Sequence, residues 1–89
     1  MIGFKGFDKN WKCRDFQYEV GKTFEESVKP KICDKGLHFC EMPLDVFDYY
    51  EPTNGNKFAM VEALGDIDKG DDKVATNKLK IDSEFFRHL

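Results

Sequence analysis

Four side chains with metal-binding chemistry lie in the first half of the chain: Cys13, Cys33, His38 and Cys40. Together they could supply the three thiolates and one imidazole of a closed tetrahedral zinc site. No two of these cysteines have the Cys-x-x-Cys spacing that makes a zinc assignment specific. Free cysteines are also among the most buried residue types and pack as small apolar groups. Core packing is therefore the favoured interpretation, and zinc is the cofactor to expect only if the fold brings the four side chains together.

A second group of polar side chains is expected on strands, where they could handle a small ligand. His38, Glu62 and Tyr18 could act as acid, base or ligand-orienting groups if they converge in a cleft. Their pattern loosely resembles the strand-borne polar residues of ADP-ribosyltransferase-like folds, and this resemblance implies a nucleotide-handling domain. The chain has no Glu-x-Glu pair, no Gly-rich phosphate loop and no Ser or Cys nucleophile motif. We therefore predict no catalytic residue, and the alternative for His38 is a structural role beside the turn at Gly36.

A third group combines acidic and aromatic side chains in one short segment. Residues 41–72 carry nine acidic and two basic side chains. Three rings of that segment, on Phe47, Tyr49 and Tyr50, are too closely spaced to face inward together from one short helix. Exposed rings beside carboxylates are frequent interface anchors. We predict a protein-binding surface at Asp45, Asp48, Tyr49 and Tyr50, with a solvated acidic helix face as the alternative.

Length and composition indicate one small domain spanning residues 1–89. The chain is 40% hydrophobic and 15% aromatic, so much of its core must come from rings. No apolar run approaches the roughly 20 residues of a membrane-spanning helix, and the start lacks a secretory signal, so we expect a cytosolic protein without a membrane partner. An odd number of cysteines fits reduced thiols in that compartment. The net charge of −3, without a basic stripe, argues against direct nucleic-acid binding.

The hydrophobic pattern predicts the strands that must position these groups. Alternating apolar residues indicate strands at Ile2–Phe7, Phe16–Val20, Leu37–Cys40, Lys57–Leu64 and Val74–Ile81, and Thr23–Phe24 can resume the second of them after a bend at Gly21. The strands Lys57–Leu64 and Val74–Ile81 should pair as a hairpin around an acidic turn at residues 65–72. The fold class that we predict is α+β, a small single domain of mostly antiparallel sheet, with four to five strands and one main helix packed on it.

That main helix is expected after the predicted strand that contains His38. Pro43 suits the first helical position, and we expect the helix to run to Tyr50 with Leu44 and Phe47 facing inward and Tyr50 as a further candidate for that face. Ser83 is a candidate cap for a short last helix containing Phe85 and Phe86.

Three stretches of the chain resemble a family of small bacteriophage and prophage domains. They are Cys13-Arg14-x-Phe16-Gln17-Tyr18-Glu19-Val20-Gly21-Lys22-Thr23, then Cys33-x-x-Gly36-x-His38-x-Cys40-Glu41 followed by Pro43-Leu44-Asp45-Val46-Phe47-x-Tyr49-Tyr50, then Val61-Glu62-Ala63-Leu64-Gly65. The resemblance implies an accessory protein of a phage or mobile element that works in the host bacterial cytoplasm. Small phage proteins of this kind are often inhibitors of host defence, including anti-CRISPR proteins, so a host or defence-system protein is the expected partner.

Overall fold

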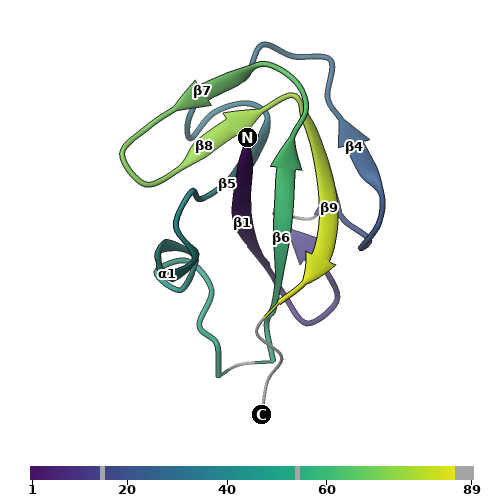
Figure 1. Ribbon diagram of the computed structural model, residues 1–89, viewed down its shortest axis with the longest axis vertical. Coiled ribbons are helices and arrows are strands. Elements are labelled where there is room, and N and C mark those ends of the chain that lie inside the picture. Colours follow the sequence, from purple (N-terminus) through teal and green to yellow (C-terminus); the bar gives the residue numbers. More distant parts are fainter. Residues whose placement is uncertain (15, 54, 86–89) are drawn as a thin grey trace.

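The computed structural model describes residues 1–14, 16–53 and 55–85, and most of its regular structure is antiparallel β-sheet (Figure 1). Its elements in chain order are β1 (Ile2–Phe7), β2 (Lys12–Cys13), β3 (Phe16–Gln17), β4 (Thr23–Glu25), β5 (Leu37–Phe39), α1 (Pro43–Val46), β6 (Lys57–Ala63), β7 (Ile67–Lys69), β8 (Val74–Thr76) and β9 (Lys78–Glu84). They form a four-stranded sheet β1-β6-β9-β4, a three-stranded sheet β5-β8-β7 and a two-stranded ribbon β2-β3. A bridge between Phe4 and Cys40 ties β1 to the end of β5. The mostly antiparallel sheet predicted from the sequence is confirmed.

The two larger sheets share one long hairpin that bends in its middle. β6 pairs with β9 and, beyond the bend, β7 pairs with β8. At the bend the Asp66 N–H donates to the Asn77 side chain (2.9 Å), and Thr76 Oγ1 donates to the Asp66 carbonyl (2.8 Å). These bonds satisfy main-chain groups that would otherwise need partners in the strand ladder. The bend carries β7 and β8 across the end of the first sheet, as Figure 1 shows.

Side chains from both larger sheets meet in one main apolar core. Its buried members are Phe7, Tyr18, Leu37, Phe39, Ala59, Val61, Ala63, Val74, Leu79 and Ile81. Tyr18 makes edge-to-face contacts with Phe7 and Phe24, at ring-centroid separations of 5.3 and 5.1 Å. Such contacts stabilise a core beyond the area they bury. Rings therefore supply a large share of the burial in this small domain.

The hairpin differs from the prediction in how its strands are divided. The predicted strand Lys57–Leu64 and its hairpin with the last strand are confirmed as β6 and β9. The predicted strand Val74–Ile81 is wrong as one element, because the bend at Asn77 divides it into β8 and β9 of different sheets. The acidic segment 65–72, expected as a turn, contains β7 because its backbone pairs with β8.

Two other expected elements also differ. The predicted strand Phe16–Val20 is only β3, and the N–H of Tyr18 already donates to the carbonyl of Trp11 outside any strand (2.9 Å). Ser83 lies within β9 and caps no helix there. The expected last helix also included Phe86, which lies outside the described residues.

The expected main helix is a single turn. α1 spans Pro43–Val46, and the chain continues to Tyr50 through turns closed mainly by i→i+3 hydrogen bonds. Val46 is buried, whereas Leu44, which we expected to face inward, is 73% exposed. The inner face differs because Val46 and Tyr50 lie close against Gly6 of β1. The fold is therefore mostly sheet with one short helix, and across the described ranges no helix is long or apolar enough to cross a membrane.

Candidate functional site

A cleft with a volume of about 380 Å³ opens beside β1, β5 and the turn that follows α1. Lys5 comes from β1, Cys13 and Arg14 from the end of β2, His38 from β5, and Tyr50 from the turn after α1. These residues lie far apart in the sequence, so the cleft is assembled by tertiary structure alone. Mixed apolar and polar clefts of this size are typical of small-molecule sites.

Lys5 is the buried charged residue of the cleft, with 4% of its surface exposed. Its ammonium donates to the carbonyl of His38, lies 3.6 Å from Cys13 Sγ and sits 5.1 Å from the ring centroid of Tyr18. Burial lowers the pKa of Lys5 from its usual 10.5, and the neighbouring Cys13 sulfur partly offsets that shift. Among the described residues no carboxylate forms an ion pair with Lys5.

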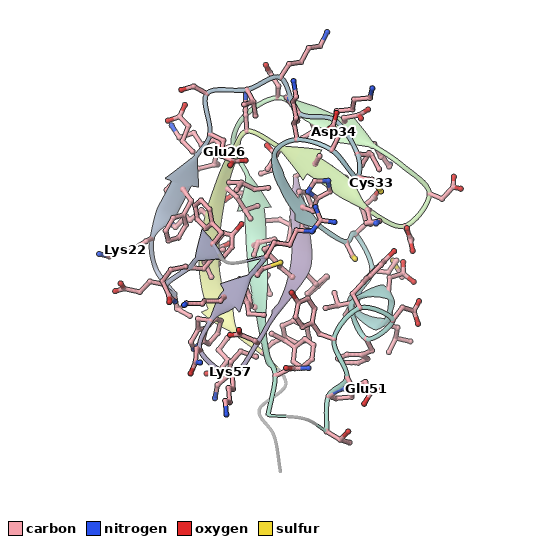
Figure 2. The ribbon with its side chains drawn as sticks, turned by 180° about the vertical axis from the view of Figure 1, so that it is seen from behind. Lys22, Glu26, Cys33, Asp34, Glu51 and Lys57 are labelled. Atoms are coloured by element: carbon pink, nitrogen blue, oxygen red, sulfur yellow. The ribbon has the colours of Figure 1, made fainter. Side chains whose placement is uncertain are left out.

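Two further cations, Arg14 and Lys73, line the same cleft. Lys73 Nζ lies 4.9 Å from the ring centroid of Tyr49 and 3.3 Å from Cys33 Sγ. Within the described part of the chain neither cation has an ion-pair partner. Glu26, labelled in Figure 2, is the single carboxylate among the described lining residues, so three basic side chains and one acidic side chain line the cleft. Basic side chains therefore outnumber acidic ones in the cleft, although the whole chain has a net charge of −3.

Arg14 lines the cleft in an unfavourable backbone conformation. Its φ angle is 53°, in the left-handed region that L-residues other than Asn and Asp seldom adopt. Such conformations raise the free energy by about 1–3 kcal/mol and often occur where a side chain must be presented to a ligand. The strain at Arg14 therefore adds to the reasons for regarding this cleft as the site.

Phenol and thiol groups complete the polar lining. The Tyr50 hydroxyl donates to Cys13 Sγ (3.2 Å), and burial raises the pKa of Tyr50 well above its usual value. The Tyr49 hydroxyl donates to Asp72 (2.7 Å), and this bond is the main cause that raises the pKa of Tyr49 to about 12. Both phenols are therefore protonated donors at neutral pH.

His38 supports the wall of the cleft in its neutral form. Its Nε2 accepts a hydrogen bond from the Cys33 N–H (3.0 Å), and the ring also bonds to the backbone of Gly36. Burial lowers the pKa of His38, and the nearby cations Lys5 and Arg14 lower it further. Cys33 and Gly36 both have positive φ, at 63° and 100°. The imidazole therefore stabilises the tight turn that contains these two residues.

Acidification is expected to destabilise the protein through His38. Because its pKa is lowered in the folded state, the unfolded chain binds more protons between that lowered value and the usual 6.5. The free energy of unfolding should therefore fall as the pH falls below 6.5. Urea titrations across this range should show a shallower decrease for His38→Gln, which keeps an acceptor for the Cys33 N–H. Equal pH dependence in the two proteins would contradict this role.

Comparison with known proteins assigns the chain to a family. The family model described as "Domain of unknown function (DUF7666)" matches residues 1–87. The chain belongs to this family. No curated protein and no solved structure matches the chain. The match includes every strand and every cleft residue described above, so the cleft lies within the DUF7666 domain itself.

The four predicted zinc ligands occupy different environments in this DUF7666 chain. Cys13 contacts Lys5 and Tyr50, and Cys33 is exposed beside Lys73. Cys40 is buried, and burial raises the pKa of its thiol to about 11. In the part of the chain that the structure describes, no three His, Cys, Asp or Glu side chains form a group that could hold a metal ion. Zinc binding remains a prediction that these positions do not support.

The predicted ligand-binding residues are only partly brought together. Tyr18 and His38 line the cleft, whereas Glu62 lies on β6 opposite Ile2 of β1 and is not among the lining residues. The sequence interpretation missed the cations of the cleft. One signal was available for Lys5, because strand alternation places it on the same face as Phe7, a core residue. A lysine on the inward face of a strand is a candidate functional residue.

The predicted protein-binding residues divide into exposed and inward groups. Asp48 is exposed, Tyr49 is 46% exposed and Asp45 is half-buried. Tyr50 instead turns toward Cys13 and lines the cleft, so its ring is only partly available to a protein partner. Beside them Met42 and Leu44 are 62% and 73% exposed, which the sequence interpretation missed because it expected Leu44 inward.

Proposed function

We propose that this protein binds a small anionic ligand in the cleft, and that the ligand is of the nucleotide class. The observation that carries the proposal is that three cations, Lys5, Arg14 and Lys73, line one cleft without a carboxylate partner among the described residues. A buried ammonium without an opposite charge is unfavourable, and an anionic ligand would compensate it. Phosphate groups are well suited to a site that combines a guanidinium with ammonium groups.

Aromatic lining supports a ligand that also carries a flat ring. The rings that face the cleft come from β1, β3, β5 and the segments next to β3 and α1: Phe4, Phe16, Tyr18, Phe39, Tyr49 and Tyr50. Ring faces favour stacked or edge-on contact with a planar group such as a nucleobase. The cleft volume of about 380 Å³ accommodates a ligand of mononucleotide size.

Neutralising the two outer cations of the cleft is expected to weaken ligand binding. The double variant Arg14→Gln with Lys73→Gln should bind AMP or ADP-ribose at least tenfold more weakly, a loss of about 1.4 kcal/mol. Isothermal titration calorimetry measures the affinity. Both substitutions keep a long polar side chain, so urea unfolding should show little change in stability.

A matched control removes the same charge outside the cleft. Lys22 and Lys57 are labelled at the edges of the molecule in Figure 2, and neither lines the cleft. The double variant Lys22→Gln with Lys57→Gln should bind AMP and ADP-ribose as the unmodified protein does. Equal weakening in both double variants would show an unspecific charge effect and would contradict the proposed site.

A second candidate function is protein binding, and the exposed apolar side chains around α1 favour it. Met42, Leu44 and Tyr49 are exposed beside the carboxylates of Asp45 and Asp48. Apolar groups rimmed by charge are typical of protein interaction surfaces. Under this second candidate function, the protein is an accessory factor of a phage or mobile element that inhibits a bacterial defence system in the host cytoplasm.

Charge reversal at α1 tests this second function. Asp45→Lys with Asp48→Lys should reduce the recovery of a bacterial defence protein by the tagged chain at least tenfold, because steering and orientation depend on charge. Asp34→Lys with Glu19→Lys makes the same charge change at exposed positions elsewhere and should leave recovery unchanged. Quantitative mass spectrometry of captured proteins gives the comparison. Unchanged recovery with the α1 variant would remove this surface as the contact.

A further inference from the structure

The buried amine of the cleft has surroundings that suit covalent chemistry. Resting on the proposed anionic ligand, we propose that Lys5 forms an imine with an aldehyde that also carries a phosphate or similar anionic group. Lys5 lines the cleft although only 4% of its surface is exposed, so the cleft is the route by which a ligand would approach its side chain. Among the described residues no carboxylate pairs with it, so no counter-ion holds it permanently in the ammonium form.

The other two cations fix the orientation of such a ligand. Arg14 is exposed and Lys73 is half-buried, whereas Lys5 is buried. This gradient places the anionic group of the ligand toward solvent, between a guanidinium and an ammonium, and directs the uncharged aldehyde inward. Desolvated lysines in apolar pockets are the amines that proteins use for imine formation. The direction in which burial shifts the pKa of Lys5 agrees with this role.

The same contacts that hold the amine can hold the product. The Lys5 nitrogen donates to the His38 carbonyl, and a protonated imine keeps one N–H for that bond. The positive charge of a protonated imine would remain near the ring of Tyr18, whose centroid lies 5.1 Å from the amine nitrogen. The product therefore retains a hydrogen bond and a ring contact that the structure already shows for the amine.

The reaction balances without an oxidant or reductant. The lone pair of the neutral Lys5 amine attacks the aldehyde carbon, a C–N bond forms, and the carbonyl oxygen takes a proton to give a carbinolamine. That oxygen then leaves as water together with the two hydrogens lost by the nitrogen, which forms the C=N bond of a neutral imine. Uptake of one proton from the solvent gives the protonated imine with its single N–H. Cys13 Sγ lies 3.6 Å from the amine and accepts a hydrogen bond from Tyr50, so these groups are placed to relay protons.

Pyridoxal 5′-phosphate is a suitable probe because it joins an aldehyde, a flat ring and a phosphate. The full chain is treated with one equivalent of the probe, reduced with borohydride to fix the imine as a secondary amine, and mapped by peptide mass spectrometry. Lys5 should carry at least tenfold more label than any exposed lysine. Pyridoxal without its phosphate, or the probe with excess inorganic phosphate, should label Lys5 at least tenfold less.

Variants that keep Lys5 test whether its labelling depends on the other two cations of the cleft. Arg14→Gln with Lys73→Gln leaves Lys5 in place and should reduce its labelling at least tenfold, whereas Lys22→Gln with Lys57→Gln should leave it unchanged. Label spread over exposed lysines, with Lys5 unmodified, would overturn the imine proposal.

Amide NMR of the same samples distinguishes the two proposals. If the probe shifts cleft resonances reversibly but Lys5 takes no label, the imine is excluded and anion binding stands. If the probe neither shifts cleft resonances nor labels Lys5, both proposals fail for this ligand class.

Discussion

Replacing Lys5 with methionine is expected to abolish ligand binding while the fold is retained. Methionine matches the length of the lysine stem and removes the buried charge, and the neighbouring rings of Phe7 and Tyr18 should accept its apolar side chain. Affinity for AMP or ADP-ribose should fall at least a hundredfold, which corresponds to about 2.7 kcal/mol. A phosphate that is not held outward by an attached aldehyde can approach Lys5 itself. The loss should then exceed that for the outer cations, because the interaction with a buried charge is weakly screened. Calorimetry gives the affinity, and Lys57→Met is the control with the same substitution outside the cleft.

The pH dependence of stability gives Lys5→Met a second, independent readout. Because the pKa of Lys5 is lowered in the folded state, the unfolded chain binds more protons between the lowered value and 10.5. The lysine therefore contributes a rise in stability as the pH rises through that window. The difference in unfolding free energy between the two proteins isolates this contribution, since other groups titrate in both. Two results would contradict the assigned role of Lys5. One is normal ligand affinity of Lys5→Met, and the other is an unfolding free energy that changes with alkaline pH as it does in the unmodified protein.

Gly6→Ala is expected to destabilise the protein by about 2–3 kcal/mol and to open the cleft wall. A Cβ atom at this position would lie 2.6 Å from the Tyr50 ring and 2.9 Å from Val46 Cγ1, well inside van der Waals contact. Val46 is fully packed, so Tyr50 must move, and its hydroxyl should lose the bond to Cys13. Urea unfolding measures the stability, and loss of ligand affinity should accompany it.

Gly70→Ala is the matched control for this steric argument. The nearest atom to a Cβ at Gly70 lies 3.4 Å away, and its φ is outside the left-handed region. Its stability should therefore change by less than about 1 kcal/mol. Similar losses for both glycine variants would show that general flexibility of glycine, and not the contact with Tyr50, explains the effect.

Local sequence patterns predicted the strands well where one face of the strand is buried. Alternation located β1, β6 and the short β5, and the glycine at position 36 marked a turn that indeed has positive φ. The bend at Asn77 was not predictable by alternation, because a side-chain hydrogen bond to a distant main-chain group creates it. Pro43 started a helix as expected, but close packing of Val46 and Tyr50 on β1 set its inner face.

The site was harder to predict than the fold. Tyr18 and His38 were expected to share a ligand site and do line one cleft, whereas Glu62 lies elsewhere on the sheet. Arg14 and Lys73 are separated by most of the chain, and only the β2–β3 ribbon and the outer half of the bent hairpin bring them to one cleft. No local pattern distinguishes such lysines and arginines from solvated surface charges.

An NMR titration of the unmodified, isotope-labelled protein with AMP tests the central claim most directly. If the cleft binds this ligand class, saturable amide shifts should gather at Lys5, Gly6, His38 and Tyr50, and should be absent at the distant Lys22. Shifts that scatter over the surface, or that are absent from these cleft residues at millimolar ligand, would contradict an anion-binding cleft.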